Sequence, residues 1–300
     1  MRLVFLGSPS DAVPMLEALV GAGHEVALVV TQPDRRHRRR AEPEPTPVRE
    51  AAETLGLPVL TPQRSAEIVD DVASSGATLG VAVAFGQLLP PDLLDALPNG
   101  YVNVHFSLLP AWRGAAPVER ALLAGDTETG VSLMRIEAGL DSGPVYARAT
   151  TPIGRTDTAG DLHERLVELG TGLLLDNLGS VPGATPEPQT GEASYADKLT
   201  TAEFELDWSR PAAVLDRWVR AGNPRPGAWT TDRGSRLKIW CASVVDDRSP
   251  GEPGVLRPDG TVVTGDGLLA LHEVQPQDRR VMDASAWLAG RRSRAEQLGT

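Results

Sequence analysis

Short continuous runs of apolar residues alternate with amphipathic stretches through the first hundred residues of the chain. Such runs are typical of strands that are buried on both faces of a sheet. They cover residues 3–6, 26–31, 59–60 and 77–85, and a further strand is predicted over residues 102–106. The helical patterns between them cover residues 13–22, 47–55 and 66–74. Strands and helices that alternate at this spacing predict an α/β fold, with a mostly parallel sheet and helices on both of its faces.

The pattern changes after residue 130. Two strands are predicted over residues 131–136 and 145–149, joined by the glycine-bearing loop EAGLDSGP. A long helix is predicted over residues 158–178, with Thr158 and Asp161 as its cap. Its apolar face is defined by leucines at helical spacing, namely Leu162, Leu166, Leu169 and Leu173.

The last third of the chain has a different organisation. The Pro-, Gly- and Thr-rich stretch VPGATPEPQTG predicts a linker. A helix is predicted over residues 212–221, and short strands are predicted over residues 236–244, 254–256, 261–264 and 268–274. Short strands at near-regular spacing predict a small antiparallel barrel. We expect an α/β domain over residues 1–180, a linker over 181–205 and a β-barrel domain over 206–300.

Composition narrows the class of protein. The chain has 300 residues, of which 41% are hydrophobic and 23% charged, so bulk disorder is excluded. Cys241 is the only cysteine, which excludes a disulfide framework and favours a reducing, cytoplasmic compartment. The start MRLVFLG argues against a signal peptide. The sequence contains no run of about 18 apolar residues, so no membrane span is predicted. The net charge of −11 speaks weakly against nucleic acid, although a local basic patch can still bind phosphate.

Three polar residues are candidates for chemistry. Asn103 and His105 lie two positions apart on a predicted strand, so both side chains share one face. The strand must end before Pro110, which places the pair at the carboxyl edge where open α/β sheets bind ligands. An amide and an imidazole can both donate to a developing oxyanion. Asp141, in a glycine loop, could favour the imidazolium and move a proton.

Spacing alone does not decide whether these three residues have a catalytic or only a structural role. An Asn-x-His pair at a strand end often has only a structural role, and an Asp in a glycine loop is commonly a turn former. GSPSDAVP has a single glycine and is a poor dinucleotide motif, and no phosphate-binding loop or metal-ligand spacing occurs. The run from Arg35 to Arg40 is either a solvated loop or a phosphate-binding element.

Longer motifs resemble a known family. NVHFSLLPAWRGAAP, which begins at Asn103, is similar to the signature of methionyl-tRNA formyltransferases, a branch of the 10-formyltetrahydrofolate-dependent formyltransferases. The resemblance extends to LVFLGSPSDAVPMLEAL, VVTQPDR, AFGQLLP, GDTETGVSLMRIEAGLDSGPV, SYADKL, LDWSRPA, NPRPGAW and VQPQDRRVMDASAWLAGR. It implies a Rossmann-like formyltransferase domain followed by a small OB-like β-barrel that binds tRNA.

The resemblance also implies residue roles. The catalytic residues would be Asn103, His105 and Asp141. The formyl donor, 10-formyltetrahydrofolate, would lie against Phe85, Gly86, Gln87, Leu88, Ser107, Leu108, Leu109, Pro110, Gly139 and Leu140. The acceptor, initiator methionyl-tRNA, would contact Arg35, Arg36, Arg38, Arg39, Arg40 and Lys198. No metal, no membrane and a monomeric protein are expected.

Two other functions stay open at this point. The first is formyl transfer to an amino sugar nucleotide or another small amine, with the acidic net charge as its only support. The second is a non-catalytic folate- or RNA-binding protein, which is disfavoured because Asn103, His105 and Asp141 are all present.

Overall fold

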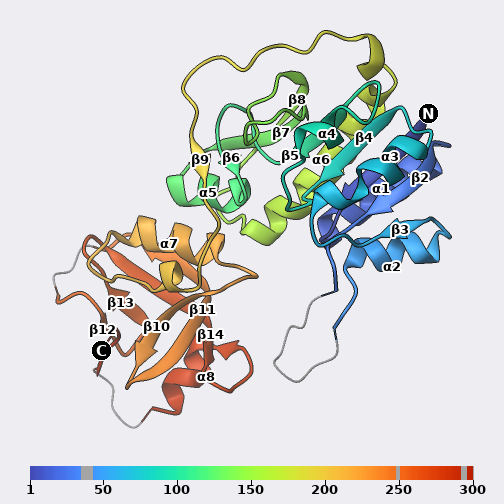
Figure 1. The fold of residues 1–300 in the computed structure, drawn as a ribbon. Coiled ribbons are helices and arrows are strands. Elements are labelled where there is room, and N and C mark those ends of the chain that lie inside the picture. The colour runs from blue at the N-terminus through green and yellow to red at the C-terminus, as the bar shows by residue number, and fades with distance from the viewer. Residues whose placement is uncertain (35–42, 248–250, 292–295, 300) are drawn as a thin grey trace. The chain divides into compact units, whose positions relative to one another are not determined.

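The chain forms two compact units in the computed structural model (Figure 1). The structure describes residues 1–34, 43–247, 251–291 and 296–299. The N-terminal unit contains Met1–Pro117, Glu128–Pro152 and His163–Asp197. The C-terminal unit contains Lys198–Thr300 together with the two short segments Val118–Thr127 and Ile153–Leu162.

A seven-stranded sheet forms the centre of the N-terminal unit. Its strands are β1 (Arg2–Gly7), β2 (Glu25–Val30), β3 (Val59–Leu60), β4 (Leu79–Val83), β5 (Tyr101–His105), β7 (Glu128–Arg135) and β8 (Val145–Pro152). They lie in the order β3-β2-β1-β4-β5-β7-β8. The first five pair in parallel, whereas β7 and β8 are antiparallel to their neighbours. The predicted mostly parallel sheet is therefore confirmed, with an antiparallel edge.

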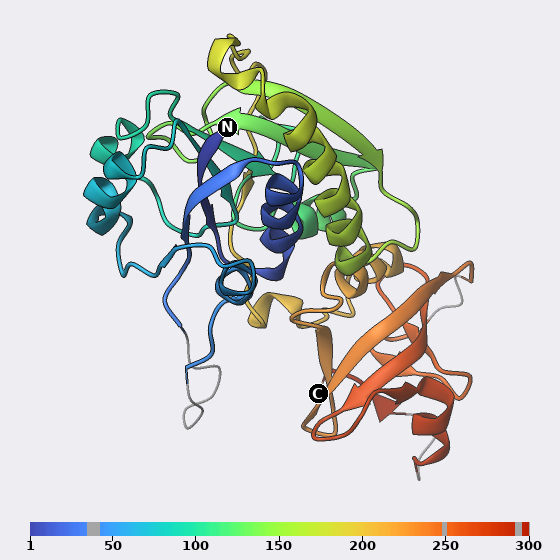
Figure 2. The same cartoon turned by 90° about the vertical axis from the view of Figure 1, so that its right-hand side faces the viewer.

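Helices cover both faces of this sheet. They are α1 (Val13–Gly21), α2 (Pro47–Thr54), α3 (Val69–Ser74), α4 (Pro91–Leu94) and α6 (Ala159–Leu178). Helix α5 (Pro117–Ala124) belongs, from Val118 on, to the C-terminal unit. On one face, Val72 of α3 and Leu93 of α4 belong to the same apolar cluster as Val4 and Leu28 of the strands. Figure 2 shows α1 (dark blue) and α6 (yellow-green) on the other face.

Helix α6 is held by its cap and by a close approach to the sheet. The backbone N–H of Thr158 donates to Asp161, and the Asp161 N–H donates back to the Thr158 hydroxyl, which confirms the predicted cap. The leucine face is confirmed only in part, because Leu169 is half-buried. The helix also approaches the sheet closely at Gly170, where an added Cβ would lie 3.0 Å from Val104. A small residue there lets α6 pack close to β5.

The segment that follows α6 folds back along the N-terminal unit. Glu187 and Val145 exchange two backbone hydrogen bonds, of 2.8 and 2.9 Å. Further on, β9 (Tyr195–Ala196) pairs in parallel with β6 (Arg113–Gly114). Residues 187–196, called the strap below, are thus fixed at one end to the edge strand β8 and at the other end to β6.

The C-terminal unit is an antiparallel sheet that curls into a half barrel. Its strands are β10 (Ala228–Asp232), β11 (Ser235–Val245), β12 (Val255–Leu256), β13 (Thr261–Val263), β14 (Leu268–Pro276), β15 (Met282–Asp283) and β16 (Glu296–Gln297). The helices α7 (Ala212–Ala221) and α8 (Ala284–Ala289) pack on it. The predicted antiparallel C-terminal domain is confirmed. No helix within the described residues is long and apolar enough to cross a membrane.

Candidate active site

The polar pair predicted from the sequence lies at the carboxyl end of β5. Asn103 and His105 alternate with Val104, so both side chains project from one face of the sheet. His105 is 6% exposed, while Asn103 is half-buried and can still be reached by a ligand. Among the described residues, no hydrogen bond engages the Asn103 amide. The amide is therefore available to donate to a bound substrate.

His105 has one partner on each ring nitrogen. Its Nε2 lies 2.9 Å from the carbonyl oxygen of Trp112. Because a carbonyl can only accept, Nε2 must carry a proton in this contact. Its Nδ1 lies 3.8 Å from Oδ2 of Asp141. A neutral ring therefore presents a lone pair on Nδ1, and only the protonated ring can donate from Nδ1.

Asp141 is brought to His105 by an unusual loop conformation. Its φ of 45° lies in the left-handed region, which is sparsely populated by residues other than glycine. Oδ2 accepts a hydrogen bond of 2.9 Å from the backbone N–H of Gly114. The side chain is 18% exposed. The structure thus places Asp141 beside His105, as the resemblance implied, and it shows the contact that fixes the carboxylate.

The turn predicted to contact the formyl donor follows β4. Gly86 has a φ of 80°, and the carbonyl of Phe85 accepts a hydrogen bond of 3.0 Å from Gln32. The side chain of Gln87 accepts from the Ser65 N–H at 2.6 Å. Leu88 is 70% exposed, which is unusual for a large apolar side chain. The turn is therefore anchored by hydrogen bonds at Phe85 and Gln87, and it exposes the apolar side chain of Leu88.

The side chains of the other residues predicted to contact folate differ in their exposure to solvent. Ser107 and Leu109 are buried, so their side chains face the interior, while Leu108 and Pro110 are half-buried. Gly139 and Leu140 precede Asp141 in its loop, and Leu140 is 52% exposed. Exposed leucines on two separate loops could hold a flat aromatic ring system.

The residues expected to contact tRNA are only partly described. Arg35, Arg36, Arg38, Arg39 and Arg40 lie outside the described residues. Before them, Asp34 accepts two hydrogen bonds of 2.9 Å from Arg49 of α2. Lys198 is exposed at the start of the C-terminal unit.

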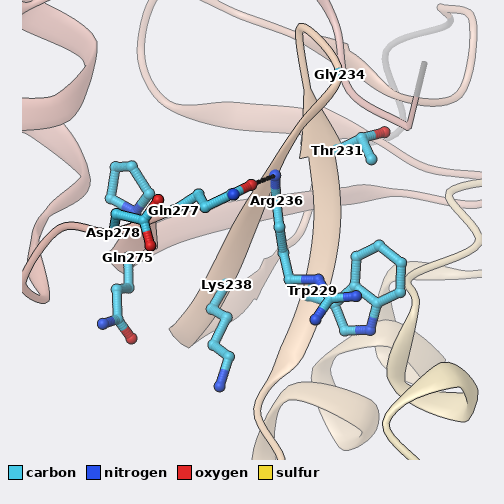
Figure 3. Close-up of a pocket in the computed structure, with 9 residues that line it drawn as sticks. Trp229, Thr231, Gly234, Arg236, Lys238, Gln275, Gln277 and Asp278 are labelled. Atoms are coloured by element: carbon cyan, nitrogen blue, oxygen red, sulfur yellow. Dashed lines mark hydrogen bonds between the residues drawn. The ribbon is translucent and has the colours of Figure 1, made fainter.

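A cavity of about 580 Å³ lies on the half barrel (Figure 3). It is lined by Trp229, Thr231, Gly234, Arg236, Lys238, Gln275, Pro276, Gln277 and Asp278. The Arg236 guanidinium lies 4.1 Å from the centre of the Trp229 ring. The Lys238 ammonium lies 5.0 Å from the Trp240 ring and donates to the Pro226 carbonyl at 2.8 Å. Two cations beside aromatic rings are suited to phosphate and base contacts.

Three residues around His105 were not predicted as part of the site. Trp112 and Gly114 act through their backbone groups, and backbone contacts leave no side-chain signal in a sequence. Gln189 lies in the stretch predicted to be a linker, yet its side chain reaches the Asp141 loop. No motif in the sequence marked Gln189 as functional.

The fold and site together define a class of enzyme. An open α/β sheet carries an amide, an imidazole and a carboxylate at its carboxyl edge. An amide and a protonated imidazole suit reactions that pass through a tetrahedral oxyanion, such as the transfer of a formyl or acyl group.

Comparison with known proteins gives the particular family. The family model "Formyl transferase" matches residues 1–178, and "Formyl transferase, C-terminal domain" matches residues 198–292. The chain belongs to the formyl transferase family and is a formyl-transferring enzyme. It is 45% identical over 294 residues to a methionyl-tRNA formyltransferase of Ruegeria pomeroyi, covering 97% of both chains. It is 46% identical over 297 residues to one of Dechloromonas aromatica, covering 97% of this chain and 96% of the relative.

Solved structures agree on the fold. An N-formyltransferase from Helicobacter canadensis, in complex with folinic acid and dTDP-3-aminofucose, has a TM-score of 0.68 at 17% identity. That match covers 90% of this chain and 99% of the other. HypX from Aquifex aeolicus, in complex with tetrahydrofolic acid, has a TM-score of 0.67 at 19% identity. It covers 97% of this chain and 47% of the other.

Proposed function

We propose that the protein transfers the formyl group of 10-formyltetrahydrofolate to the amino group of methionyl-initiator tRNA, as a step of translation initiation. The observation that carries this proposal is the 45% identity over 97% of both chains with methionyl-tRNA formyltransferases. The juxtaposition of His105 with Asp141, next to Asn103 on β5, supplies the chemistry. The single thiol, Cys241, accords with a cytoplasmic protein.

Asn103 and His105 stabilise the oxyanion in this mechanism. The methionine amine attacks the formyl carbon, and the formyl oxygen takes the negative charge. The Asn103 amide donates to that oxygen. His105 donates from Nδ1, because Nε2 is already engaged by the Trp112 carbonyl. Removing one donor of this kind costs about 100- to 1000-fold in rate.

Asp141 faces His105 with its carboxylate and helps to move a proton. The carboxylate lies 3.8 Å from Nδ1, so its negative charge offsets positive charge on the ring in the form that donates from Nδ1. The attacking amine loses one proton, and N10 of the departing tetrahydrofolate gains one. Asp141 is 18% exposed and lies beside the reacting groups, so it can relay that proton directly or through water.

The loops around β5 fit a folate donor. Leu88 and Leu140 present apolar side chains at the tips of two loops, and the rigid Phe85–Leu88 turn offers backbone groups. A pterin ring needs apolar surfaces on its faces and polar groups at its edge. The tetrahydrofolate and folinic acid complexes of the two similar folds support the same donor.

The cavity on the half barrel supports an RNA acceptor. Arg236 and Lys238 face it, and among the described residues of its lining Asp278 is the one carboxylate. We assign it, together with Lys198 and the run from Arg35 to Arg40, to contacts with tRNA phosphates. A small amine would need no such surface.

A direct comparison of acceptors tests the proposal. The purified protein is incubated with 10-formyltetrahydrofolate and either methionyl-initiator tRNA or a dTDP-amino sugar, and formylated product is measured. We expect rapid transfer to the tRNA and transfer to the sugar at least about 1000-fold slower. Rapid transfer to the sugar alone would move the assignment to a small-amine formyltransferase. No transfer to either acceptor by folded protein would contradict both functions.

A further inference from the structure

The strap forms hydrogen bonds to both segments that carry the contact partners of His105, namely the Trp112 carbonyl and the Asp141 carboxylate. Its Ser194 hydroxyl accepts from the Trp112 N–H at 2.9 Å, and the Ser194 carbonyl accepts from the Arg113 N–H at 2.9 Å. These bonds fix the peptide whose carbonyl meets Nε2 of His105. The strap also reaches the loop that carries Asp141, through the side chain of Gln189.

The Gln189 amide uses its full hydrogen-bonding capacity. Its Nε2 donates to the backbone carbonyls of Asp141 and Gly143, at 2.8 and 2.7 Å. Its Oε1 accepts two bonds from the Arg113 guanidinium, at 3.0 and 2.7 Å. The orientation of this amide is fixed, because a flipped amide would set its NH₂ against a guanidinium and its oxygen against two carbonyls.

The bond network closes around the catalytic carboxylate. Gln189 ties Arg113 to the main chain of Asp141, while the next residue, Gly114, donates its N–H to the Asp141 carboxylate. Asp141 has a φ of 45°, a conformation that persists only where the surroundings impose it. Gln189 bonds Asp141 at the backbone, and Gly114 bonds it at the side chain.

We infer that Gln189 is a positioning residue for formyl transfer, which holds the Asp141 carboxylate against His105 through the two donor bonds of its amide. This inference rests on the proposed function. It gives the strap a role in the reaction, since the strap carries Gln189 into contact with the loop. A misplacement of about 1 Å in such a group costs on the order of 100-fold in rate.

Two variants separate positioning from simple docking of the strap. In Gln189→Glu the carboxylate still accepts from Arg113 but has no donor for the two carbonyls. Gln189→Met removes all four bonds at similar side-chain length. We expect both to lower kcat by about 10- to 100-fold, with the KM for each substrate within about threefold. Glu192→Gln, on an exposed residue of the same strap, is the matched control and should be unchanged.

A double-mutant cycle tests whether Gln189 acts through Asp141. In an Asp141→Asn background, Gln189→Glu should lower kcat by less than about twofold further, because the group that it positions is already disabled. Hydrogen exchange supplies a readout that does not depend on activity: residues 139–143 should exchange faster in Gln189→Glu than in the wild type.

Several outcomes would overturn the inference. A Gln189→Glu variant with wild-type kcat would show that only the contact with Arg113 matters. Full additivity with Asp141→Asn, or unfolding of both Gln189 variants, would reduce Gln189 to a structural residue. If the wild type transfers no formyl group to methionyl-tRNA, the proposed function fails; unchanged exchange at residues 139–143 would then count separately against the positioning role.

Discussion

The charge of Asp141 can be removed with almost no change of shape. In the wild type, the N–H of Gly114 donates to Oδ2 of Asp141 at 2.9 Å. In Asp141→Asn, an amide oxygen replaces Oδ2 and can still accept this hydrogen bond. The loop conformation and the bonds from Gln189 involve only the main chain of residue 141 and stay in place. The perturbation is therefore confined to the negative charge that faces His105.

The distance sets the size of the effect. Two unit charges 3.8 Å apart attract each other by about 4 kcal/mol at an effective dielectric constant of about 20. Asp141 is 18% exposed, so solvent screening weakens this attraction, and we take about 2 kcal/mol as its lower bound. Since about 1.4 kcal/mol corresponds to a tenfold change in rate, kcat should fall by about 30- to 1000-fold.

The assay is single-turnover formyl transfer at saturating 10-formyltetrahydrofolate and methionyl-tRNA. Asp92→Asn, which removes an exposed carboxylate from α4 of the same unit, is the control and should match the wild type. A thermal unfolding midpoint within about 2 °C of wild type would show that the fold is intact. An Asp141→Asn enzyme within threefold of wild-type kcat would refute the electrostatic role assigned to this residue.

Three further predictions concern the strap, the half barrel and the thiol. Gly114→Ala should destabilise the N-terminal unit by about 1–3 kcal/mol in a denaturant titration, because its φ of 125° is strained for alanine and a Cβ would lie 2.7 Å from the Ala196 carbonyl; unchanged stability would contradict the observed backbone. Arg236→Ala and Lys238→Ala should each weaken tRNA binding and lower the slope of log affinity against log salt by about one, measured by filter binding, and an unchanged slope would remove the cavity from the RNA interface. Partial desolvation, followed by the nearby carboxylates, raises the pKa of the exposed Cys241 thiol, so its alkylation rate should still be rising with pH where an unperturbed thiol has levelled off. A rate that levels off at the same pH as that of an unperturbed thiol, or lower, would contradict this environment.

The sequence predicted those parts of the fold that leave a local signal. Helix α7 was predicted with its observed bounds, Ala212–Ala221, and the segment VNVHF predicted β5 to within one residue. The alternation of a strand then placed Asn103 and His105 on one face. By contrast, β10 (Ala228–Asp232) was missed, because AWTTD has no apolar alternation and its partner β11 supplies the pairing.

The rest of the site depends on contacts between residues that are far apart in the sequence. Asp141 meets His105 across 36 positions, and no pattern along the chain measures that distance. Gln189 lies in a Pro- and Gly-rich stretch whose composition resembles a free linker, yet its side-chain bonds fix it to Arg113 and to the loop of Asp141. The leucines of α6 leave a sequence signal, whereas Gly170, whose small size allows close packing against Val104, leaves none.

The most direct test of the central claim is formyl transfer from 10-formyltetrahydrofolate to methionyl-initiator tRNA, measured for the wild type, Asn103→Ala and His105→Ala. The account predicts rapid transfer by the wild type and a loss of about 100- to 1000-fold in each variant, with folding unchanged. Transfer that survives both substitutions would contradict the assignment of the oxyanion site, and a folded wild type that transfers no formyl group would contradict the proposed function.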